Sequence, residues 1–312
     1  MTRFLPDSTL TAPPRSAWKR RQRLTEGAAR LVMFAAALLS VVTTLAIVAV
    51  LVGESIPFFQ RVPLAEYLGG TRWAPLLEPR SFGVLPLIAG TVLVAGIAAV
   101  VAIPLGLGSA IYLSEYAPER LRRVAKAILE VLAGIPTVVY GYFALVTVTP
   151  ILQRLYPPTQ IFNAASAGIV MGIMILPMVS SLCEDALAAV PTTLRDGGYA
   201  LGSTRYEVAV RVVLPAALSG VIAAFLLAIA RAVGETMIVT LAAGANPRLT
   251  LNPFEGVQTM TAYIAQISMG DVPAGTIEYR TIFAVGLTLL VLTAALNLIA
   301  HAVVRRYRQE YE

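Results

Sequence analysis

Six long, uncharged and apolar runs restrict what this chain of 312 residues can fold into. Crossing a bilayer as a helix takes roughly 20 apolar residues, and each run is of that order. Soluble domains carry about 25% charged residues, whereas 13% are charged here and 57% are hydrophobic. Since the runs do not alternate in polarity as barrel strands do, we expect an all-α, polytopic membrane protein. Its six transmembrane helices are expected within Leu31–Gly53, Ser81–Ser114, Val131–Gln153, Ala164–Cys183, Val212–Ala243 and Thr281–Val304.

The basic residues between these runs predict an orientation. With the N-terminus inside, 17 of the 24 Lys and Arg residues lie in cytoplasmic segments and 6 lie in external ones. Cytoplasmic flanks of membrane spans are enriched in basic residues, so both termini are expected in the cytoplasm. This gives a cytoplasmic tail at 1–30, a membrane domain at 31–305 and a cytoplasmic tail at 306–312. The net charge of +6 then reflects contact with the lipid bilayer, and we expect no nucleic-acid partner.

Two charged residues stand inside the fifth run. Arg231 and Glu235 are four positions apart, so a continuous helix would place them on one face. A charge in the bilayer centre costs at least about 2.5–3.5 kcal/mol, and such residues commonly mark a substrate path. Arginine offers a planar set of donors that favours an anion. We therefore predict a substrate path at Arg231 and Glu235; the alternative is a permanent ion pair that fastens this subunit to a neighbour.

The segment between the fourth and fifth runs, residues 184–213, is expected to hold two short cytoplasmic helices. Pro191 is typical of the first turn of a helix, and Gly202 of its C-terminal end. Thr204 and Glu207 have the spacing of a capping box for the next helix.

A second polar segment precedes the third apolar run. In it, Arg122, Arg123 and Lys126 lie close enough to Glu130 in the sequence to be its ion-pair partners. The basic segment 119–130 is expected to lie on the membrane surface.

The stretch "DGGYALGSTRYEVAVRVVLP" resembles the EAA loop of permeases of ABC importers. In that family the loop forms a coupling helix that sits in a cleft of the cytoplasmic ATPase. The resemblance assigns ATPase coupling to the 184–215 loop. Aspartate replaces the usual glutamate, and glycines replace the usual alanines. The matching positions are Asp196, Gly197, Gly198, Gly202, Val212, Leu214 and Pro215.

Other segments are similar to the permease subunits of phosphate-specific ABC importers, PstC-type more than PstA-type. They include "FGVLPLIAGTV", "GLGSAIYLSEYA", "LEVLAGIPTVVYGYFAL", "ARAVGETM" and "MTAYIAQISMG". The resemblance implies a prokaryotic inner-membrane protein that forms part of a path for inorganic phosphate. It also implies a second permease (PstA-type), two ATPase subunits (PstB-type) and an external phosphate-binding protein (PstS-type).

The sequence also indicates what the chain itself does not do. It has two lysines and no Gly-x-x-x-x-Gly-Lys-Ser/Thr stretch, the signature of a phosphate-cradling ATPase loop. We therefore expect no enzyme activity and no cofactor in this chain, with ATP and Mg bound by the partner ATPases. With one cysteine and one histidine, no metal site is expected. Two alternatives stay open: an ABC permease for another oxyanion, such as phosphonate or sulfate, and a self-contained secondary transporter or channel.

Overall fold

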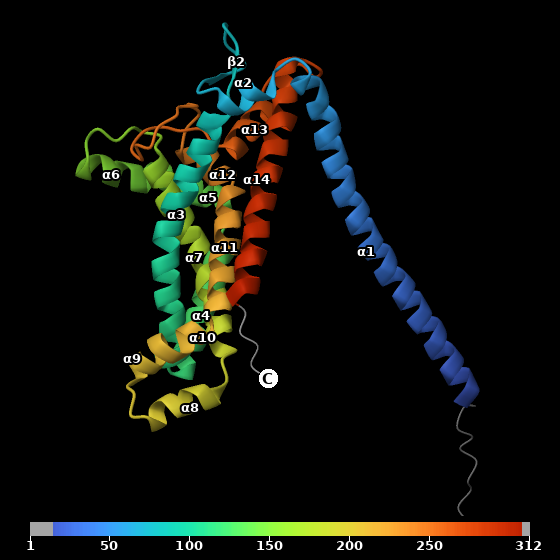
Figure 1. Ribbon diagram of the computed structural model, residues 1–312, viewed down its shortest axis with the longest axis vertical. Coiled ribbons are helices and arrows are strands. Elements are labelled where there is room, and N and C mark those ends of the chain that lie inside the picture. The colour runs from blue at the N-terminus through green and yellow to red at the C-terminus, as the bar shows by residue number, and fades with distance from the viewer. Residues whose placement is uncertain (1–14, 308–312) are drawn as a thin grey trace, which may run out of the picture. The chain divides into compact units, whose positions relative to one another are not determined.

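The computed structural model describes residues 15–307, which form two compact units that divide after Gly53 (Figure 1). Within the described residues, the first unit consists of helix α1 (Arg15–Phe59) up to Gly53. The last residues of this helix, from Glu54 to Phe59, belong to the second unit. This helix contains the first expected span, but it begins at Arg15, so the expected N-terminal tail is helical from that residue onward. Residues 1–14 and 308–312 of the expected tails lie outside the described part.

The second unit is almost entirely helical. Its elements are α2 (Leu64–Gly69), β1 (Trp73–Ala74), β2 (Ser81–Phe82), α3 (Leu85–Ile111), η1 (Tyr112–Tyr116), α4 (Glu119–Gly134), α5 (Thr137–Phe143), η2 (Ala144–Val148), α6 (Thr149–Leu155), α7 (Ala164–Ala188), α8 (Thr192–Ala200), α9 (Arg205–Val208), η3 (Ala209–Val213), α10 (Leu214–Ala216), α11 (Leu218–Val233), α12 (Met237–Ala242), α13 (Met260–Met269) and α14 (Ile277–Tyr307), where η marks π-helical turns.

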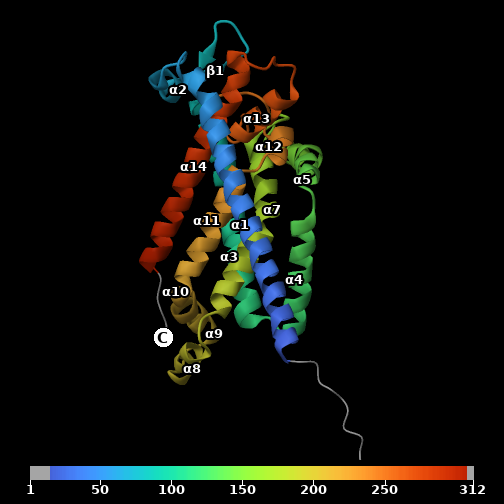
Figure 2. The ribbon, with the colours of Figure 1, turned by 90° about the vertical axis from the view of Figure 1, so that its right-hand side faces the viewer.

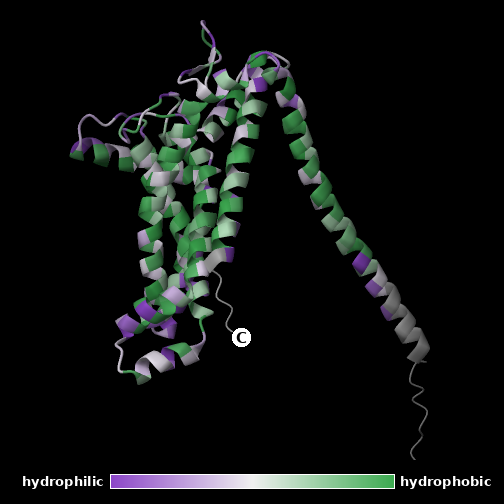
Figure 3. Ribbon diagram, in the orientation of Figure 1, coloured by the Kyte–Doolittle hydropathy of each residue, from purple (hydrophilic) through white to green (hydrophobic). Residues whose placement is uncertain are grey.

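Long apolar helices form the body of this unit. In both views α3, α7, α11 and α14 run side by side, with α8 and α9 at one end (Figures 1 and 2). The short elements α2, α13 and the antiparallel pair β1–β2 lie at the other end. Apolar residues cover the long helices, and polar residues gather near α8 and α9 (Figure 3). The C-terminal end of α14 and the expected coupling segment therefore lie toward the same end of the unit.

The number of spans agrees with the sequence, although one span is bent. In the described part of the chain, five helices are long and apolar enough to cross a membrane. A sixth span arises if Arg205–Ala216 and Leu218–Val233 are taken together, and these two segments meet at an angle of 73°. The bend lies at Ala217, which leaves the helical conformation with φ −87° and ψ 0°. The fifth expected run, Val212–Ala243, is therefore not one straight helix.

Glycines allow α3 and α7 to pack closely. A Cβ at Gly106 would lie 2.6 Å from Val179 Cγ1, and one at Gly172 would lie 2.7 Å from Val101 Cβ. Small residues permit such close approach of membrane helices, where contact area and not water exclusion supplies the stabilisation. Helix α7 begins at Asn163, whose buried side chain accepts a hydrogen bond from Ser166 N at 2.7 Å. This cap satisfies one of the free N–H groups of the first turn.

An aromatic cluster joins the short elements at the opposite end from α8. Trp73 meets Tyr263 edge to face with ring centroids 5.0 Å apart, and Tyr67 contacts Phe58 in the same manner. The Tyr67 hydroxyl shares a hydrogen bond of 2.8 Å with Thr288 of α14. Burial raises the pKa of Tyr67 and of Tyr263 far above the ordinary range of tyrosine. Both phenols are therefore neutral and anchor the short elements at this end of the unit by packing and hydrogen bonding.

The region of the third expected span differs from the expectation. The apolar candidate helix covers Thr137–Leu155, whereas α4 is a separate helix that ends at Gly134, just before Pro136. Proline disfavours a helical conformation for the residue before it, and Ile135 is accordingly extended with ψ 129°. Figure 2 shows α4 running lengthwise beside the long helices. The segment 119–130 thus packs along α7, and our prediction that it lies flat on the membrane surface is wrong.

Candidate functional site

The helix that carries Arg231 ends before it reaches Glu235. Helix α11 stops at Val233, and Gly234 follows as its C-cap. The Glu235 carboxylate accepts hydrogen bonds from the backbone N–H groups of Met237 (3.0 Å) and Ile238 (3.4 Å) at the start of α12. Negative side chains stabilise helix N-termini in this way. Our expectation that Arg231 and Glu235 share one helix face is therefore wrong, because the chain turns between them.

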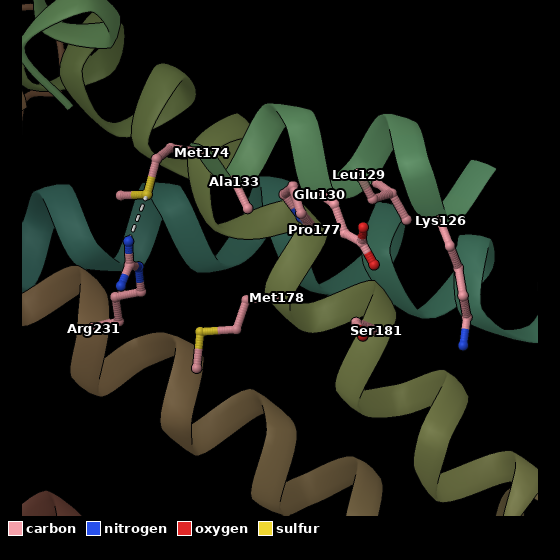
Figure 4. A pocket seen from close by; sticks show the side chains of 9 residues that line it. All are labelled: Lys126, Leu129, Glu130, Ala133, Met174, Pro177, Met178, Ser181 and Arg231. Atoms are coloured by element: carbon pink, nitrogen blue, oxygen red, sulfur yellow. Dashed lines mark hydrogen bonds between the residues drawn. The ribbon is translucent and has the colours of Figure 1, made fainter. Parts of the chain in front are cut away.

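Arg231 instead lines a cavity of about 420 Å³ between α4, α7 and α11. Its Nη2 donates to the sulfur of Met174 at 3.8 Å, which is a weak acceptor. Figure 4 shows Arg231 and Lys126 toward opposite ends of the lining, with Glu130 between them. Among the described residues, no carboxylate forms an ion pair with Arg231. Most of its donors thus stay available for an anion or for an acceptor on a partner subunit. The other lining residues are Leu129, Ala133, Pro177, Met178 and Ser181.

A buried carboxylate holds the N-terminal half of α4 against the C-terminal part of α7. Glu184 of α7 has a fully buried side chain and pairs with Arg122 and Lys126 of α4. Sequence analysis considered Glu130 as the partner of these bases, but Glu130 lines the cavity. A buried charge is tolerated where it is paired and is costly where it is not. The signal in the sequence is that Glu184 directly follows the fourth apolar run.

Four of the residues expected to couple to an ATPase, Asp196, Gly197, Gly198 and Gly202, lie on α8 and the turn after it. Gly198 is buried, and a Cβ there would lie 3.0 Å from Val208 Cγ2. Asp196 and Gly197 are exposed, and nothing lies within 4 Å of a Cβ placed at Gly197. The glycine pair therefore gives α8 one position packed against the chain and one open position. The exposed face is free for a partner, and its role in coupling stays a prediction.

The turn between α8 and α9 has the conformation that its residues predict. Gly202 adopts φ +81°, a region that residues with a side chain seldom enter. Thr204 then caps α9 through a complete capping box with Glu207. Leu214 is half-buried against the core of the unit and Pro215 is exposed, in the short helix α10 just before the bend. These two residues thus lie where the segment that contains α8 and α9 meets the apolar helix α11.

Two buried charged residues beside this segment were not among the functional residues predicted from the sequence. Arg195 of α8 forms an ion pair with Glu115 of η1, and both side chains are largely buried. Arg195 immediately precedes the motif that we matched, and Glu115 lies within the quoted segment "GLGSAIYLSEYA". Their pairing joins positions 80 residues apart, and no local pattern predicts such a contact.

Comparison with known proteins places this geometry in a family. Residues 102–309 match the family model of the binding-protein-dependent transport system inner membrane component. The match covers two thirds of the chain. The chain belongs to this family. It is therefore a multi-pass membrane permease of the kind found in ABC transporters, with the all-α architecture expected from the sequence.

Individual relatives are similar over most of the permease chain. The phosphate transport system permease protein PstC of Mesorhizobium japonicum is 35% identical over 260 residues, covering 77% of this chain and 78% of that protein. The PstC protein of Methanocaldococcus jannaschii, which carries the word "probable" in its name, is 32% identical, with 81% and 87% covered. The "Probable ABC transporter permease protein YqgH" of Bacillus subtilis is 34% identical, with 88% and 89% covered.

Solved structures share the fold at lower identity. A chain of the bacterial alginate ABC transporter, crystallised with a pentasaccharide-bound periplasmic protein, matches with a TM-score of 0.62 and 16% identity, covering 91% of this chain and 98% of that chain. A chain of the inward-facing methionine ABC transporter MetNI matches with a TM-score of 0.54 and 20% identity, covering 73% and 95%. At such identity these neighbours establish the architecture of the permease and not its cargo.

Proposed function

We propose that this chain is the PstC-type permease subunit of an ABC importer for inorganic phosphate. The observation that carries the proposal is the Arg231 guanidinium, which lines a cavity between three helices and lacks a carboxylate partner among the described residues. The PstC relatives, at 32–35% identity over most of the chain, indicate phosphate as the anion.

The chemistry of the cavity suits a dehydrated anion. Phosphate carries one to two negative charges near neutral pH and loses hydration when it crosses the membrane. Arginine keeps its charge and presents paired N–H donors that match two phosphate oxygens at once. Lys126 adds a second positive charge to the lining, although Glu184 also pairs with it. Glu130 opposes an anion by like charge and limits how tightly it is held, as a transport site requires.

The partners follow from the ABC architecture. ATP and Mg would be bound by two PstB-type ATPase subunits, which α8 and the Gly202 turn would contact from the cytoplasm. A PstA-type permease would complete the path, and a PstS-type phosphate-binding protein would dock on the external end formed by α2, β1–β2 and α13. The 17 basic residues on the cytoplasmic side support placing α8 and both termini inside.

Family membership argues against the self-contained transporter or channel, since relatives in this family work in binding-protein-dependent systems. The oxyanion alternative is tested by uptake of radiolabelled phosphate in cells that lack this chain and regain it on a plasmid. We expect uptake to return, to be blocked by arsenate, and to be insensitive to excess sulfate or phosphonate. Restored uptake that sulfate or phosphonate competes away would reject phosphate as the cargo.

The subunit composition is tested on the same cells. Purification of the tagged chain in mild detergent should retain a second permease and an ATPase. Phosphate uptake should stop when cellular ATP is depleted while the membrane potential is maintained. A chain that transports phosphate without either companion would reject the assembly proposed here.

A further inference from the structure

Arg195 connects the candidate coupling helix to two membrane helices at once. Its Nη2 and Nε lie 3.1 and 3.4 Å from the two carboxylate oxygens of Glu115. The same guanidinium donates to the backbone carbonyl of Leu187 at 2.8 Å and to that of Val190 at 2.5 Å. Four contacts therefore fix one α8 side chain to η1, to the last turn of α7 and to Val190 just after that helix. Paired contacts of this kind determine orientation as well as energy.

The pair is protected from water. The side chain of Arg195 is 16% exposed and that of Glu115 is 6% exposed. The same segment contains a contrasting pair, Arg211–Glu207, which lies within neighbouring turns at 3.7 Å with the arginine 78% exposed. Exposed pairs of this type contribute little because water and salt screen them. Of these two pairs, the Arg195–Glu115 pair alone joins separate elements in a fixed arrangement.

The elements that Arg195 reaches belong to a closely packed pair of helices. The turn η1 directly continues α3, so Glu115 lies at the end of a span that runs from Leu85 to Tyr116. Helices α3 and α7 are packed closely through Gly106, Gly168 and Gly172. By contrast, the chain after α8 passes through the Gly202 turn and the bend at Ala217 before it enters α11. The covalent route from α8 toward α11 thus has two turning points, whereas the Arg195 route is direct.

We propose that Arg195 and Glu115 are positioning residues that transmit movement of α8 to α3 and α7 as one body. ATP-driven displacement of α8 then reaches α7, which lines the Arg231 cavity, through side-chain contacts and not through the chain after Gly202. The inference depends on the proposed function only for its readout, because any cargo of an ABC importer would report it.

The first experiment measures cargo moved per ATP hydrolysed in vesicles that contain the complete complex and the binding protein. Arg195→Gln and Glu115→Gln should each lower this ratio at least tenfold while ATP hydrolysis continues. Arg211→Gln, in the exposed pair, should leave the ratio unchanged. An unchanged ratio in Arg195→Gln would overturn the proposal. Wild-type complex that hydrolyses ATP but carries another oxyanion would contradict only the phosphate assignment, and the same ratio is then measured with that oxyanion.

A second experiment replaces the ion pair by a covalent bridge, so it also covers a glutamine variant that fails to assemble. Arg195→Cys and Glu115→Cys are combined in a Cys183→Ala background and joined by a short bis-maleimide. The double variant should be uncoupled before cross-linking, and the bridge should restore at least half of the wild-type ratio, since the proposal requires the two elements to move together. A bridged complex that hydrolyses ATP but stays uncoupled would overturn the proposal.

Discussion

The guanidinium of Arg231 lies 3.8 Å from the sulfur of Met174 and makes no ion pair with Glu235, only four positions along the chain. The two residues instead have separate surroundings, a cavity for Arg231 and the N-terminus of α12 for Glu235. Because the two side chains do not pair in this structure, the two positions should respond to mutation independently.

Two replacements of Arg231 should distinguish the effect of its positive charge on uptake from the effect of its paired N–H donors. Arg231→Lys keeps the positive charge but loses the paired donors, so phosphate uptake should fall about tenfold, the equivalent of about 1.4 kcal/mol. Arg231→Ala should abolish uptake. The measurement is radiolabelled phosphate uptake normalised to the amount of assembled complex. Arg248→Lys, at an exposed position between α12 and α13, is the control; near-normal uptake by Arg231→Lys would reject a substrate contact at Arg231.

Glu235 should act through the fold of α12. Glu235→Gln keeps an oxygen that can accept from Met237 N, so stability should change little. Glu235→Ala leaves the first N–H groups of α12 without this partner and should cost about 1 kcal/mol. Thermal unfolding of the purified complex gives the comparison. Combining Glu235→Gln with Arg231→Ala should not restore uptake, because Arg231→Ala does not leave Glu235 without an ion-pair partner. Restored uptake would show that the two residues do compensate each other.

Gly202 should be limited by its backbone conformation. Nothing lies within 4 Å of a Cβ placed there, but φ +81° costs roughly 1–2 kcal/mol for residues with a side chain, and Asn tolerates it best. Gly202→Asn should therefore keep ATPase binding and uptake, whereas Gly202→Val should lose both. Co-purification of the ATPase reports the first effect, with Gly197→Ala as a helical control. Equal behaviour of the Asn and Val variants would mean that backbone strain is irrelevant here.

The close packing of α3 and α7 should be sensitive to one added methyl group. A Cβ at Gly172 would meet Val101 Cβ at 2.7 Å, and overpacking of this kind costs about 1–3 kcal/mol. Gly172→Ala should lower the unfolding temperature and the yield of monodisperse protein. Gly96→Ala adds the same group to α3 where nothing lies within 4 Å and should have no such effect. Similar losses in both variants would point to helix propensity and not to packing.

Topology can be tested at positions that accept a cysteine without clashes. Leu77 and Leu251, 65% and 85% exposed, should be labelled by a membrane-impermeant thiol reagent in intact cells. Leu201, 88% exposed in the coupling segment, should be labelled only after the cells are opened. Gly70 and Gly198 are unsuitable, because a side chain there would meet neighbouring atoms at 2.6 and 3.0 Å. External labelling at position 201 would overturn the orientation.

Features that depend on local or one-dimensional patterns could be predicted from the amino-acid sequence. Run length and low charge specify membrane helices whatever their neighbours are, and the bases specify the orientation that we expect. The Thr204–Glu207 box and the Gly202 turn involve residues within a few positions of each other, so their spacing was sufficient to predict them. The similarity to phosphate permeases over most of the chain could also be recognised from the sequence, because it consists of matching sequence segments.

The pairing of the buried charges depends on the packing of the helices and could not be predicted from local patterns. Arg231 and Glu235 have the spacing of a helical pair, yet the helix ends at Val233 and gives them different partners. Glu184 forms ion pairs with Arg122 and Lys126, 62 and 58 positions away in the sequence, and Arg195 forms one with Glu115, 80 positions away. A buried charge must find a partner, but its choice depends on which helices pack side by side, and that is a property of the whole fold.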